Sequence, residues 1–382
     1  MAKRSAPPLS LAGKRALLRY SRHLLIPEVG LAGQERLAAS RVLVVGAGGL
    51  GSPVLTYLAA AGVGRLGVMD DDLVDETNLQ RQTLFATADI GRRKVEVAAE
   101  RLQAQNPQVA IDPIGVRFGR ENARELVGLY DVIVDCTDRF ESRYLINDAC
   151  ALEGRPDVYG SIFRFDGQVS VFARGRGPCY RCLYPQAPPP GSVPTCAEGG
   201  VLGVLAGIVG TWQANEVLKL LLGIGEPLIG RLLLIDALGA TTRQIRFEPD
   251  PQCALCGRDP SIVELEASGE RDDLPADDDL PEIDAAQLDE VLEHATLLDV
   301  REPHEAVLGI LEGSVHMPVS QLEARLHELD SAQRYVVACR VGSNSHWAAR
   351  RLRDAGFTRV VHLRGGLLAY AAARAEIGMM VF

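Results

Sequence analysis

Two Cys-x-x-Cys pairs carry the most specific chemistry in the sequence. They are Cys179-Tyr180-Arg181-Cys182 and Cys253-Ala254-Leu255-Cys256. Each pair can bind one side of a tetrahedral Zn²⁺ ion, and four thiolates leave no coordination position open for catalysis. We therefore expect a structural zinc site with Cys179, Cys182, Cys253 and Cys256 as ligands. Two separate redox pairs, or plain buried cysteines, are the alternatives.

A glycine-rich turn follows the apolar run Val42–Val45, and its glycines are Gly46, Gly48, Gly49 and Gly51. Such a turn at the start of a helix offers backbone N–H groups to phosphate oxygens. Asp70 follows at roughly the spacing at which an acidic residue accepts ribose hydroxyls. These residues indicate a nucleotide site, but they fit NAD and ATP equally well.

Two cations favour ATP over a dinucleotide. Arg81 lies in the segment Asn78-Leu79-Gln80-Arg81-Gln82, and Lys94 follows it. Transfer of an adenylyl group develops charge on the departing pyrophosphate, which fixed cations stabilise. Asp138, after Cys136-Thr137, could hold a Mg²⁺ ion that bridges phosphate oxygens. Taken singly, Arg81 could be a surface ion-pair residue and Asp138 a helix N-cap.

Two further cysteines stand out by their context. Cys196 follows the proline-rich stretch Pro185–Pro194, which suits a thiol that visits an activated acyl group. A small buried apolar residue is an equally good interpretation of Cys196. Cys339 ends the apolar run Tyr335–Ala338 and opens a short loop into a helix. The N–H donors of such a loop would stabilise a thiolate or a persulfide on Cys339.

The elements that must position these residues alternate between strand and helix. Strands are expected at 41–47, 65–70, 131–135, 168–173 and 232–237, and helices at 11–34, 52–61, 92–106 and 201–222. This alternation predicts a doubly wound, mostly parallel α/β sheet with ligands at the carboxyl ends of its strands. Residues 259–282 are acidic and indicate a solvated linker. Strands at 297–300, 335–338 and 360–363 then predict a second, smaller α/β domain.

Composition excludes several classes of protein. The 382 residues carry a formal charge of −10, which argues against a nucleic-acid groove or an anionic membrane surface. The first ten residues lack the apolar stretch of a signal peptide. The most apolar segment, Val201–Leu222, is interrupted by polar residues, so a buried or interfacial helix is expected there. We expect a cytoplasmic protein whose eight cysteines form no disulfides.

With these motifs assembled, residues 11–258 resemble the adenylyltransferases that activate ubiquitin-like sulfur carriers, such as the molybdopterin-synthase and thiamine-biosynthesis activating enzymes. The resemblance rests on Arg19-Tyr20-Ser21-Arg22, the glycine turn, Asn78–Gln82, Lys94, Cys136-Thr137-Asp138 and both Cys-x-x-Cys pairs. Residues 283–382 resemble a rhodanese domain through Asp299-Val300-Arg301-Glu302 and the Cys339 loop.

The resemblance implies a fold of the ubiquitin-activating-enzyme type and a set of site residues. The nucleotide would contact Gly46, Gly48, Gly49, Gly51, Asp70, Thr77, Asn78, Leu79, Gln80, Arg81, Lys94, Asp138 and Arg139. The catalytic residues would be Arg22, Arg81, Lys94, Asp138, Cys196 and Cys339, with Arg22 reaching across a homodimer interface. Cys196 matches the family cysteine that bonds the carrier transiently. ATP, Mg²⁺ and Zn²⁺ are the implied cofactors.

The implied reaction starts with a carrier protein whose flexible C-terminus ends in Gly-Gly. Its carboxylate attacks the α-phosphate of ATP, and a persulfide on Cys339 then delivers sulfur to the activated carboxyl group. A carboxylate needs no base, which agrees with the absence of histidine between His23 and His294. The sulfur donor would be a cysteine desulfurase or thiosulfate. Asn344 stands where many relatives carry arginine, which weakens the expectation of thiosulfate, and Arg139 replaces a common asparagine.

Two other hypotheses remain open from the sequence. One is an NAD-dependent oxidoreductase fused to a rhodanese domain, which would be indifferent to loss of Arg81. The other is a zinc-stabilised scaffold that docks a ubiquitin-like partner without turning over ATP.

Overall fold

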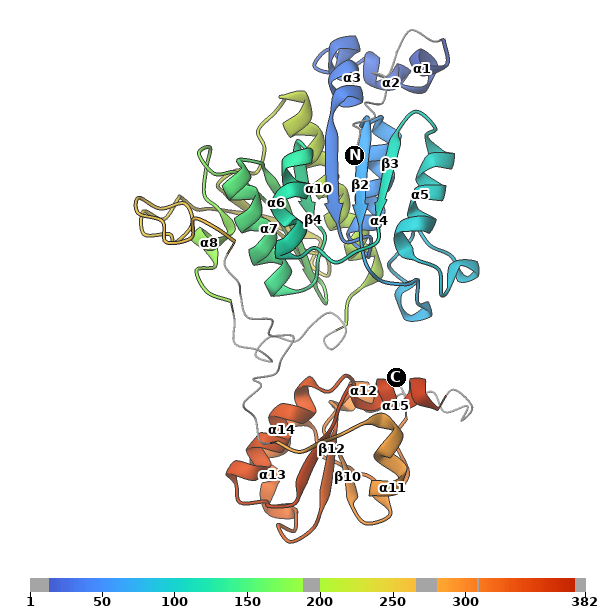
Figure 1. Cartoon of the computed structure of the whole chain (residues 1–382), viewed down its shortest axis with the longest axis vertical. Helices are drawn as coiled ribbons and strands as arrows, with labels where there is room; N and C mark the ends of the chain where they lie inside the picture. Colours follow the sequence, from blue (N-terminus) through green and yellow to red (C-terminus); the bar gives the residue numbers. More distant parts are fainter. Residues whose placement is uncertain (1–13, 188–199, 266–279, 308, 375–382) are drawn as a thin grey trace. The chain divides into compact units, whose positions relative to one another are not determined.

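The computed structural model describes residues 14–187, 200–265, 280–307 and 309–374. These residues form two compact units, of which the first ends at residue 265 and the second begins at residue 280. Each unit has its own sheet and its own cores (Figure 1).

The first unit contains an eight-stranded sheet in the order β3-β2-β1-β4-β5-β6-β7-β8. Strands β1 to β5 pair in parallel, and β6 to β8 extend the sheet in antiparallel fashion. The chain therefore has the expected α/β fold with a mostly parallel sheet. The strands are β1 (Arg41–Val45), β2 (Arg65–Met69), β3 (Ala110–Ile114), β4 (Val132–Asp135), β5 (Asp157–Phe163), β6 (Asp166–Phe172), β7 (Arg231–Asp236) and β8 (Thr241–Arg246).

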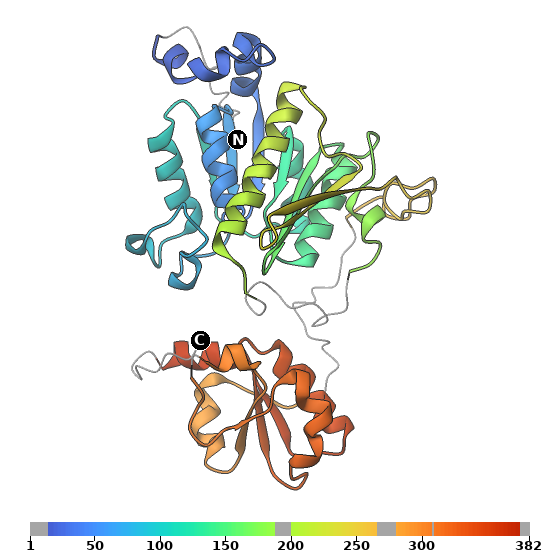
Figure 2. The same ribbon diagram turned by 180° about the vertical axis from the view of Figure 1, so that it is seen from behind.

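Helices cover both faces of this sheet. Figure 1 shows α6 and α7 on the near face, and the reverse view in Figure 2 shows α4, α5 and α10 on the other. The helical segments are α1 (Lys14–Arg19), α2 (Ser21–Leu24), α3 (Gly30–Ala39), α4 (Gly51–Ala61), η1 (Glu76–Asn78), η2 (Thr87–Asp89), α5 (Lys94–Gln105), α6 (Arg120–Leu129), α7 (Phe140–Glu153), α8 (Tyr180–Leu183) and α10 (Gly203–Leu222).

The two faces of β1 show why the sheet is buried on both sides. Val42 and Val44 belong to the core that packs under α4, α5 and α10, whereas Leu43 and Val45 belong to the core under α6 and α7. Successive residues of a strand point to opposite faces. An apolar run without alternation is therefore the pattern of a strand buried on both faces.

The predicted strands of the first unit are all present, and the strands that were not predicted have identifiable causes. Strands β3 and β8 lie at the two ends of the sheet order. Strand β3 contains Asp112 and Pro113, and every residue of β8 is exposed, so neither carries an apolar pattern. Strand β5 contains Gly160, where a side chain would collide with Gln213 at 2.3 Å.

Helix α10 is the predicted apolar helix, and it packs against α4, β5 and β6. A Cβ atom on Gly210 would lie 2.5 Å from Pro53, so this glycine permits the close approach of α10 to α4. Gln213 and Glu216 of α10 are fully buried. No helix among the described residues is long and apolar enough to cross a membrane.

The second unit contains a five-stranded sheet in the order β11-β10-β12-β13-β9, with parallel pairing throughout. Its strands are β9 (Glu282–Ile283), β10 (Thr296–Asp299), β11 (Val315–His316), β12 (Tyr335–Ala338) and β13 (Val360–Leu363). Its helical segments are η3 (Ala285–Gln287), α11 (Leu288–Leu292), α12 (Pro303–Ala306), α13 (Val319–Arg325), η4 (Leu326–Glu328), α14 (Ser343–Asp354) and α15 (Gly366–Ala373). The expected second α/β unit is present.

The expected linker at 259–282 lies partly outside the described residues. At its ends, Ile262 and Leu265 pack against cores of the first unit, and Leu280 belongs to a core of the second. Strand β9 begins at Glu282. The stretch between the two described units thus runs from 266 to 279.

Candidate functional site

The glycine turn lies between β1 and α4, at the carboxyl end of the parallel sheet. Gly46 has a φ of +96°, and a Cβ atom there would lie 2.7 Å from the carbonyl oxygen of Cys136. A Cβ atom on Gly51 would lie 2.0 Å from the Gly46 carbonyl oxygen. Both positions therefore require glycine. Gly48 and Gly49 have more room. A Cβ atom on Gly48 would lie 3.5 Å from the Gln82 side chain, and one on Gly49 would lie 3.2 Å from Ala206 and 3.3 Å from Arg81.

Asp70 follows β2 and ties the turn to the neighbouring strand. Its Oδ2 accepts a hydrogen bond from the Ala47 N–H at 2.8 Å, and its Oδ1 accepts one from the Asp72 N–H at 2.9 Å. Burial raises the pKa of Asp70 above its ordinary value, although the nearby Lys94 ammonium acts in the opposite direction. The carboxylate is thus held at the turn by backbone donors.

Arg81 lies beside the turn, on the segment that begins with η1. Its Nη2 donates to Asn78 Oδ1 at 2.8 Å and its Nη1 to the Thr77 carbonyl oxygen at 3.2 Å. Asp75 in turn caps the N–H of Thr77 at 2.8 Å. These partners are neutral, so the guanidinium is positioned without having its charge neutralised. Among the other candidates, Leu79 packs against the core and Gln80 is exposed, with its carbonyl against Gly203.

Lys94 lies at the start of α5 and is buried, with 3 % of its surface exposed. Its Nζ is 2.7 Å from Asp72 Oδ2 and 3.9 Å from Asp70 Oδ1. The charge of Lys94 is therefore balanced by carboxylates in this structure, in contrast to Arg81. Asp72 is the partner that sequence reasoning missed, and the acidic run Asp70-Asp71-Asp72 was the available signal.

Asp138 and Arg139 are exposed, at the carboxyl end of β4 and the start of α7. The preceding loop is fixed by Asp135, whose Oδ1 accepts from the Thr137 N–H at 2.9 Å and the Thr137 hydroxyl at 2.6 Å. Gln213 donates to the Asp135 carbonyl oxygen at 2.7 Å. The structure thus brings the glycine turn, Asp70, Arg81 and Asp138 to one end of the sheet, where a nucleotide site was predicted.

Arg22 lies at the opposite end of the same sheet. Its neighbour Tyr20 accepts a hydrogen bond from Asn106, just after α5, and packs against Gly62 at the end of α4. The glycine turn is at the start of α4, whose 11 residues span about 16 Å. Figure 1 shows α2 beyond the amino ends of the strands. Arg22 is exposed and has no partner among the described residues.

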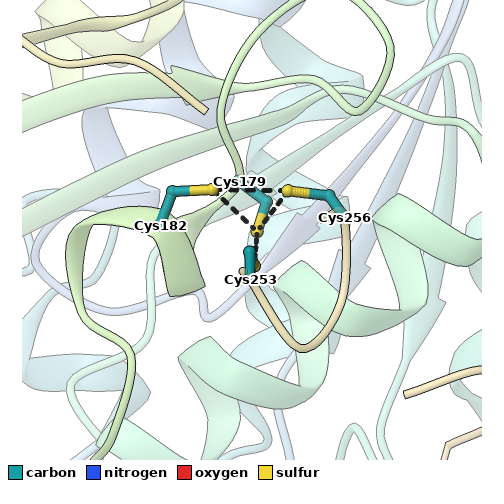
Figure 3. A group of neighbouring side chains, drawn as sticks. All are labelled: Cys179, Cys182, Cys253 and Cys256. Atoms are coloured by element: carbon teal, nitrogen blue, oxygen red, sulfur yellow. Dashed lines mark hydrogen bonds between the residues drawn. The ribbon is translucent and has the colours of Figure 1, made fainter. Parts of the chain in front are cut away.

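The four predicted zinc ligands form one cluster (Figure 3). The sulfur of Cys179 lies 3.9 Å from that of Cys182, 3.6 Å from that of Cys253 and 3.4 Å from that of Cys256. The sulfurs of Cys182 and Cys256 are 3.3 Å apart. A tetrahedral zinc site with four Zn–S bonds has sulfur atoms about 3.8 Å apart. The donor set and its spacing therefore fit a structural Zn²⁺ ion.

The close packing of these four sulfur atoms makes it unfavourable for all of them to be deprotonated at once. Burial, and then the neighbouring cysteines, raise the pKa of Cys179 far above that of a free thiol. Burial raises the pKa of Cys256 to about 12, whereas at Cys253 hydrogen bonds from the Cys256 and Leu255 N–H groups outweigh burial and lower the pKa. Four crowded sulfur atoms can be deprotonated together only when a cation compensates their charge. This arrangement favours a metal site over two separate redox pairs.

Cys339 lies at the carboxyl end of β12, in a loop that opens into α14. The Gly342 N–H donates to its sulfur at 3.1 Å, and its Sγ lies 3.6 Å from the Ser345 hydroxyl. The expected donors are thus present. Burial nevertheless raises the pKa of Cys339, against the lowering effect of Ser345, Gly342 and Val341. The N–H donors therefore act in the expected direction, and burial opposes them.

The Cys339 loop packs against Gly366, and a buried ion pair lies at the end of the neighbouring strand β10. A Cβ atom on Gly366 would lie 2.6 Å from the carbonyl oxygens of Cys339 and Arg340. Arg301 and Asp299 are both fully buried and form a two-pronged ion pair, with Nη2 and Oδ2 2.6 Å apart. Asn344 is half-buried on α14. Cys196 lies outside the described residues.

Two comparisons of sequence agree with this architecture. Residues 20–255 match the ThiF family and residues 284–373 match the rhodanese-like domain. A probable adenylyltransferase/sulfurtransferase MoeZ of Mycobacterium tuberculosis is 43 % identical and covers 96 % of this chain and 97 % of its own length. Adenylyltransferase and sulfurtransferase MOCS3 of Sus scrofa is 41 % identical over 96 % of this chain and 88 % of its own.

A shorter relative matches the first unit alone. The sulfur carrier protein adenylyltransferase of Thermus thermophilus is 53 % identical over 66 % of this chain and 95 % of its own length. Among solved structures, Escherichia coli MccB superposes with a TM-score of 0.57 at 23 % identity, over 63 % of this chain and 74 % of that chain. At that identity the superposition supports the fold of the first unit and no more.

Proposed function

The chain belongs to the ThiF family, carries a rhodanese-like domain and is an adenylyltransferase and sulfurtransferase, and we propose that its substrate is a ubiquitin-like sulfur carrier ending in Gly-Gly. The observation that supports this most is the meeting of the glycine turn, Asp70, Arg81 and Asp138 at one sheet end, in a chain that also holds Cys339 in a donor-lined loop. The relatives named for sulfur carriers support the choice of substrate.

In the proposed first step, the carrier's terminal carboxylate attacks the α-phosphate of ATP and pyrophosphate leaves. The N–H groups of the glycine turn and the Arg81 guanidinium stabilise the charge that develops on the phosphates. Asp70 accepts the ribose hydroxyls. Lys94 contacts the phosphates by exchanging one partner for another. Its ammonium group now lies 2.7 Å from the exposed Asp72 carboxylate, and a phosphate oxygen takes the place of that carboxylate.

Asp138 is the proposed ligand for Mg²⁺. It is exposed at the carboxyl end of β4, so its carboxylate can reach a bound nucleotide without loss of a buried contact. One or two carboxylates together with substrate phosphates and waters are the usual environment of Mg²⁺. When bound there, the ion would neutralise charge on the phosphate oxygens.

Arg22 is proposed to act on the partner subunit's nucleotide in a homodimer. Its position at the far end of its own sheet rules out a contact with its own site without large rearrangement, whereas its guanidinium is unpaired among the described residues. Apolar residues within four positions of it in the sequence are exposed, with Leu18 65 %, Leu25 73 % and Ile26 44 % exposed. Such side chains are suited to an interface between copies of the chain.

In the proposed second step, a donor such as a cysteine desulfurase or thiosulfate loads Cys339 as a persulfide. The terminal sulfur attacks the acyl carbon of the adenylate and AMP leaves. A thiol reductant then attacks the Cys339 sulfur and forms a disulfide with it, so that the thiocarboxylate leaves. Cys196 is the candidate for the transient bond to the carrier. The carrier is released with a C-terminal thiocarboxylate.

Pyrophosphate exchange into ATP tests the first step. We expect exchange that depends on an added Gly-Gly carrier and is lost in Arg81→Ala. Exchange that is indifferent to Arg81 would contradict the proposed nucleotide site. Tight carrier binding without exchange would support the scaffold hypothesis, and binding of NAD instead of ATP the oxidoreductase hypothesis.

Mixing two inactive variants tests the role of Arg22. In an Arg22→Ala/Arg81→Ala heterodimer, one site keeps its own Arg81 and receives Arg22 from the other subunit. We therefore expect exchange to return when the two variants are mixed under conditions that allow subunit exchange. An active monomer, or no recovery in verified heterodimers, would refute action across the interface.

A further inference from the structure

Side chains on one face of α7 form hydrogen bonds with the segment that carries the first cysteine pair, and these bonds do not involve a metal ion. Tyr144 donates through its hydroxyl to the Tyr184 carbonyl oxygen at 2.8 Å, and Asn147 Oδ1 accepts from the Tyr180 N–H at 2.7 Å. Asp148 accepts two bonds from Arg181, each 2.7 Å long. Positions spaced by three and four residues share one face of a helix. The short helix α8 is therefore attached to α7 at three points.

The strongest of these attachments is the pair formed by Asp148 and Arg181, because Arg181 lies between Cys179 and Cys182 in the sequence. Arg181 is the residue before Cys182, and its guanidinium also lies over the Tyr144 ring at 4.7 Å. Asn147 and Asp148 are 2 % and 7 % exposed, and Asn147 Nδ2 donates to Asp148 Oδ1 at 3.0 Å. A bidentate arginine–carboxylate pair at this burial fixes both partners in direction as well as distance. It holds the α8 backbone that carries Cys179 and Cys182.

The second cysteine pair is held differently. Two of its backbone bonds close on the loop itself, from the Cys253 N–H to the Asp250 carbonyl at 3.0 Å and from the Gly257 N–H to the Cys253 carbonyl at 2.9 Å, while the Asp250 N–H donates to the Cys182 sulfur at 3.4 Å. Its main attachment is the fully buried side chain of Leu255, which packs in one cluster with Ala151 of α7. This contact is apolar, and the bond from Asp250 ends on a sulfur of the cluster itself and not on α7.

We propose that Asn147, Asp148 and Arg181 are positioning residues that hold the first cysteine pair as a preformed half-site, on which the second pair closes when a metal ion binds. This inference rests on the proposed zinc site and adds an order to its assembly. Residues that orient metal ligands from outside the coordination sphere typically change metal affinity by about 10- to 100-fold when they are replaced.

The electrostatic effect of Asp148 and its role in positioning Arg181 predict opposite changes in the rate of zinc release when Asp148 is neutralised. Removal of its carboxylate leaves the Arg181 cation beside the sulfur atoms, and a cation near a thiol favours the thiolate that binds metal. Electrostatics alone therefore predicts slower zinc release from Asp148→Asn. Loss of the two bonds to Arg181 predicts faster release. The direction of the change decides between the two.

The test measures zinc release from the full chain into an excess of a chromophoric chelator. We expect release to be about tenfold faster in Asp148→Asn and in Arg181→Lys, which keeps the charge but not the bidentate geometry. Glu153→Gln is the matched control, because Glu153 ends the same helix and pairs with Arg124 at 2.7 Å, away from the cysteines. Release at the wild-type rate in both variants, or slower release in Asp148→Asn, would overturn the inference.

Hydrogen exchange of the chelator-treated wild-type chain provides a second readout. We expect amides of 180–183 to keep their protection and amides of 253–257 to lose theirs. Equal loss in both segments contradicts the half-site. A wild-type chain that contains no zinc when purified contradicts the proposed zinc site itself, whereas zinc that is bound but released equally from the variants contradicts only the half-site.

Discussion

In both units the candidate groups follow the carboxyl ends of parallel strands, yet the two sites differ in how open they are. In the first unit, Asp138 is exposed after β4 and Arg81 is held only by neutral partners. In the second, Cys339 follows β12 and is 2 % exposed, inside a loop whose N–H groups converge on one sulfur atom.

This difference matches the size of what each site is proposed to bind. A triphosphate needs several cations and N–H groups spread over two loops, and they become fully paired only with the ligand present. A persulfide adds a single sulfur atom, for which one short loop suffices. In both units the site lies at the carboxyl end of the parallel strands, and the residues of the loop that follows each strand determine what the site binds.

The largest expected effect comes from a variant that removes the reaction of the second unit and leaves that of the first. Cys339→Ala should reduce thiocarboxylate formation below detection, because the sulfur that carries the persulfide is gone. Carrier-dependent pyrophosphate exchange should stay within about twofold of wild type, since that step uses the other unit. Mass spectrometry of the carrier and an exchange assay on the same preparation check both statements.

Cys150→Ala serves as its control, because Cys150 is a buried core thiol with no proposed role. Thiocarboxylate that persists in Cys339→Ala would show that sulfur reaches the carrier by another route.

The converse variant is Arg81→Ala. Loss of one fixed charge from a developing pyrophosphate is expected to reduce exchange about 10²- to 10³-fold. Persulfide loading of Cys339, measured by intact mass, should be unchanged. Arg92→Ala is the matched control, because Arg92 pairs with Glu100 on the surface and should tolerate loss. Reduced persulfide loading in Arg81→Ala would mean that the two steps are not separable.

Substitutions at two glycines of the turn compare a position without room for a side chain with one that has room. Gly51→Ala places a methyl group 2.0 Å from a carbonyl oxygen and should cost about 1–3 kcal/mol of unfolding free energy. Gly48→Ala has 3.5 Å of clearance and should leave stability nearly unchanged. Thermal unfolding of the two variants checks the order. Equal stability would contradict the close approach at Gly51.

The smallest expected effect is the pH dependence of Cys339. Burial raises its pKa, so its thiolate fraction near neutral pH is below that of a free cysteine. Below the pKa that fraction grows about tenfold per pH unit. Alkylation of Cys339, followed by peptide mass spectrometry, should therefore accelerate through pH 8 without levelling off. A plateau below pH 7 would mean that the N–H donors outweigh burial.

The sequence predicted the strands that are buried on both faces and the cysteine cluster, because both leave strong local patterns. In the first unit it missed β3 and β8, which lie at the ends of the sheet and carry no apolar run, and also the inner strand β5, whose pattern is broken by Asp157 and Gly160. It also missed the pairing of Lys94 with Asp72, because it treated Lys94 as a phosphate ligand from the start. The contacts of Asn147 and Asp148 with α8 join residues 33 positions apart, and no local pattern encodes such contacts.

The most direct test of the central claim is the mass of the carrier's C-terminus after incubation with the full chain, ATP and a sulfur donor. We predict a thiocarboxylate that requires ATP, Arg81 and Cys339 together, and a carrier left unchanged when any one is removed. A thiocarboxylate formed without ATP, or adenylation that never leads to sulfur transfer, would contradict the account of one chain performing both reactions on the same glycine.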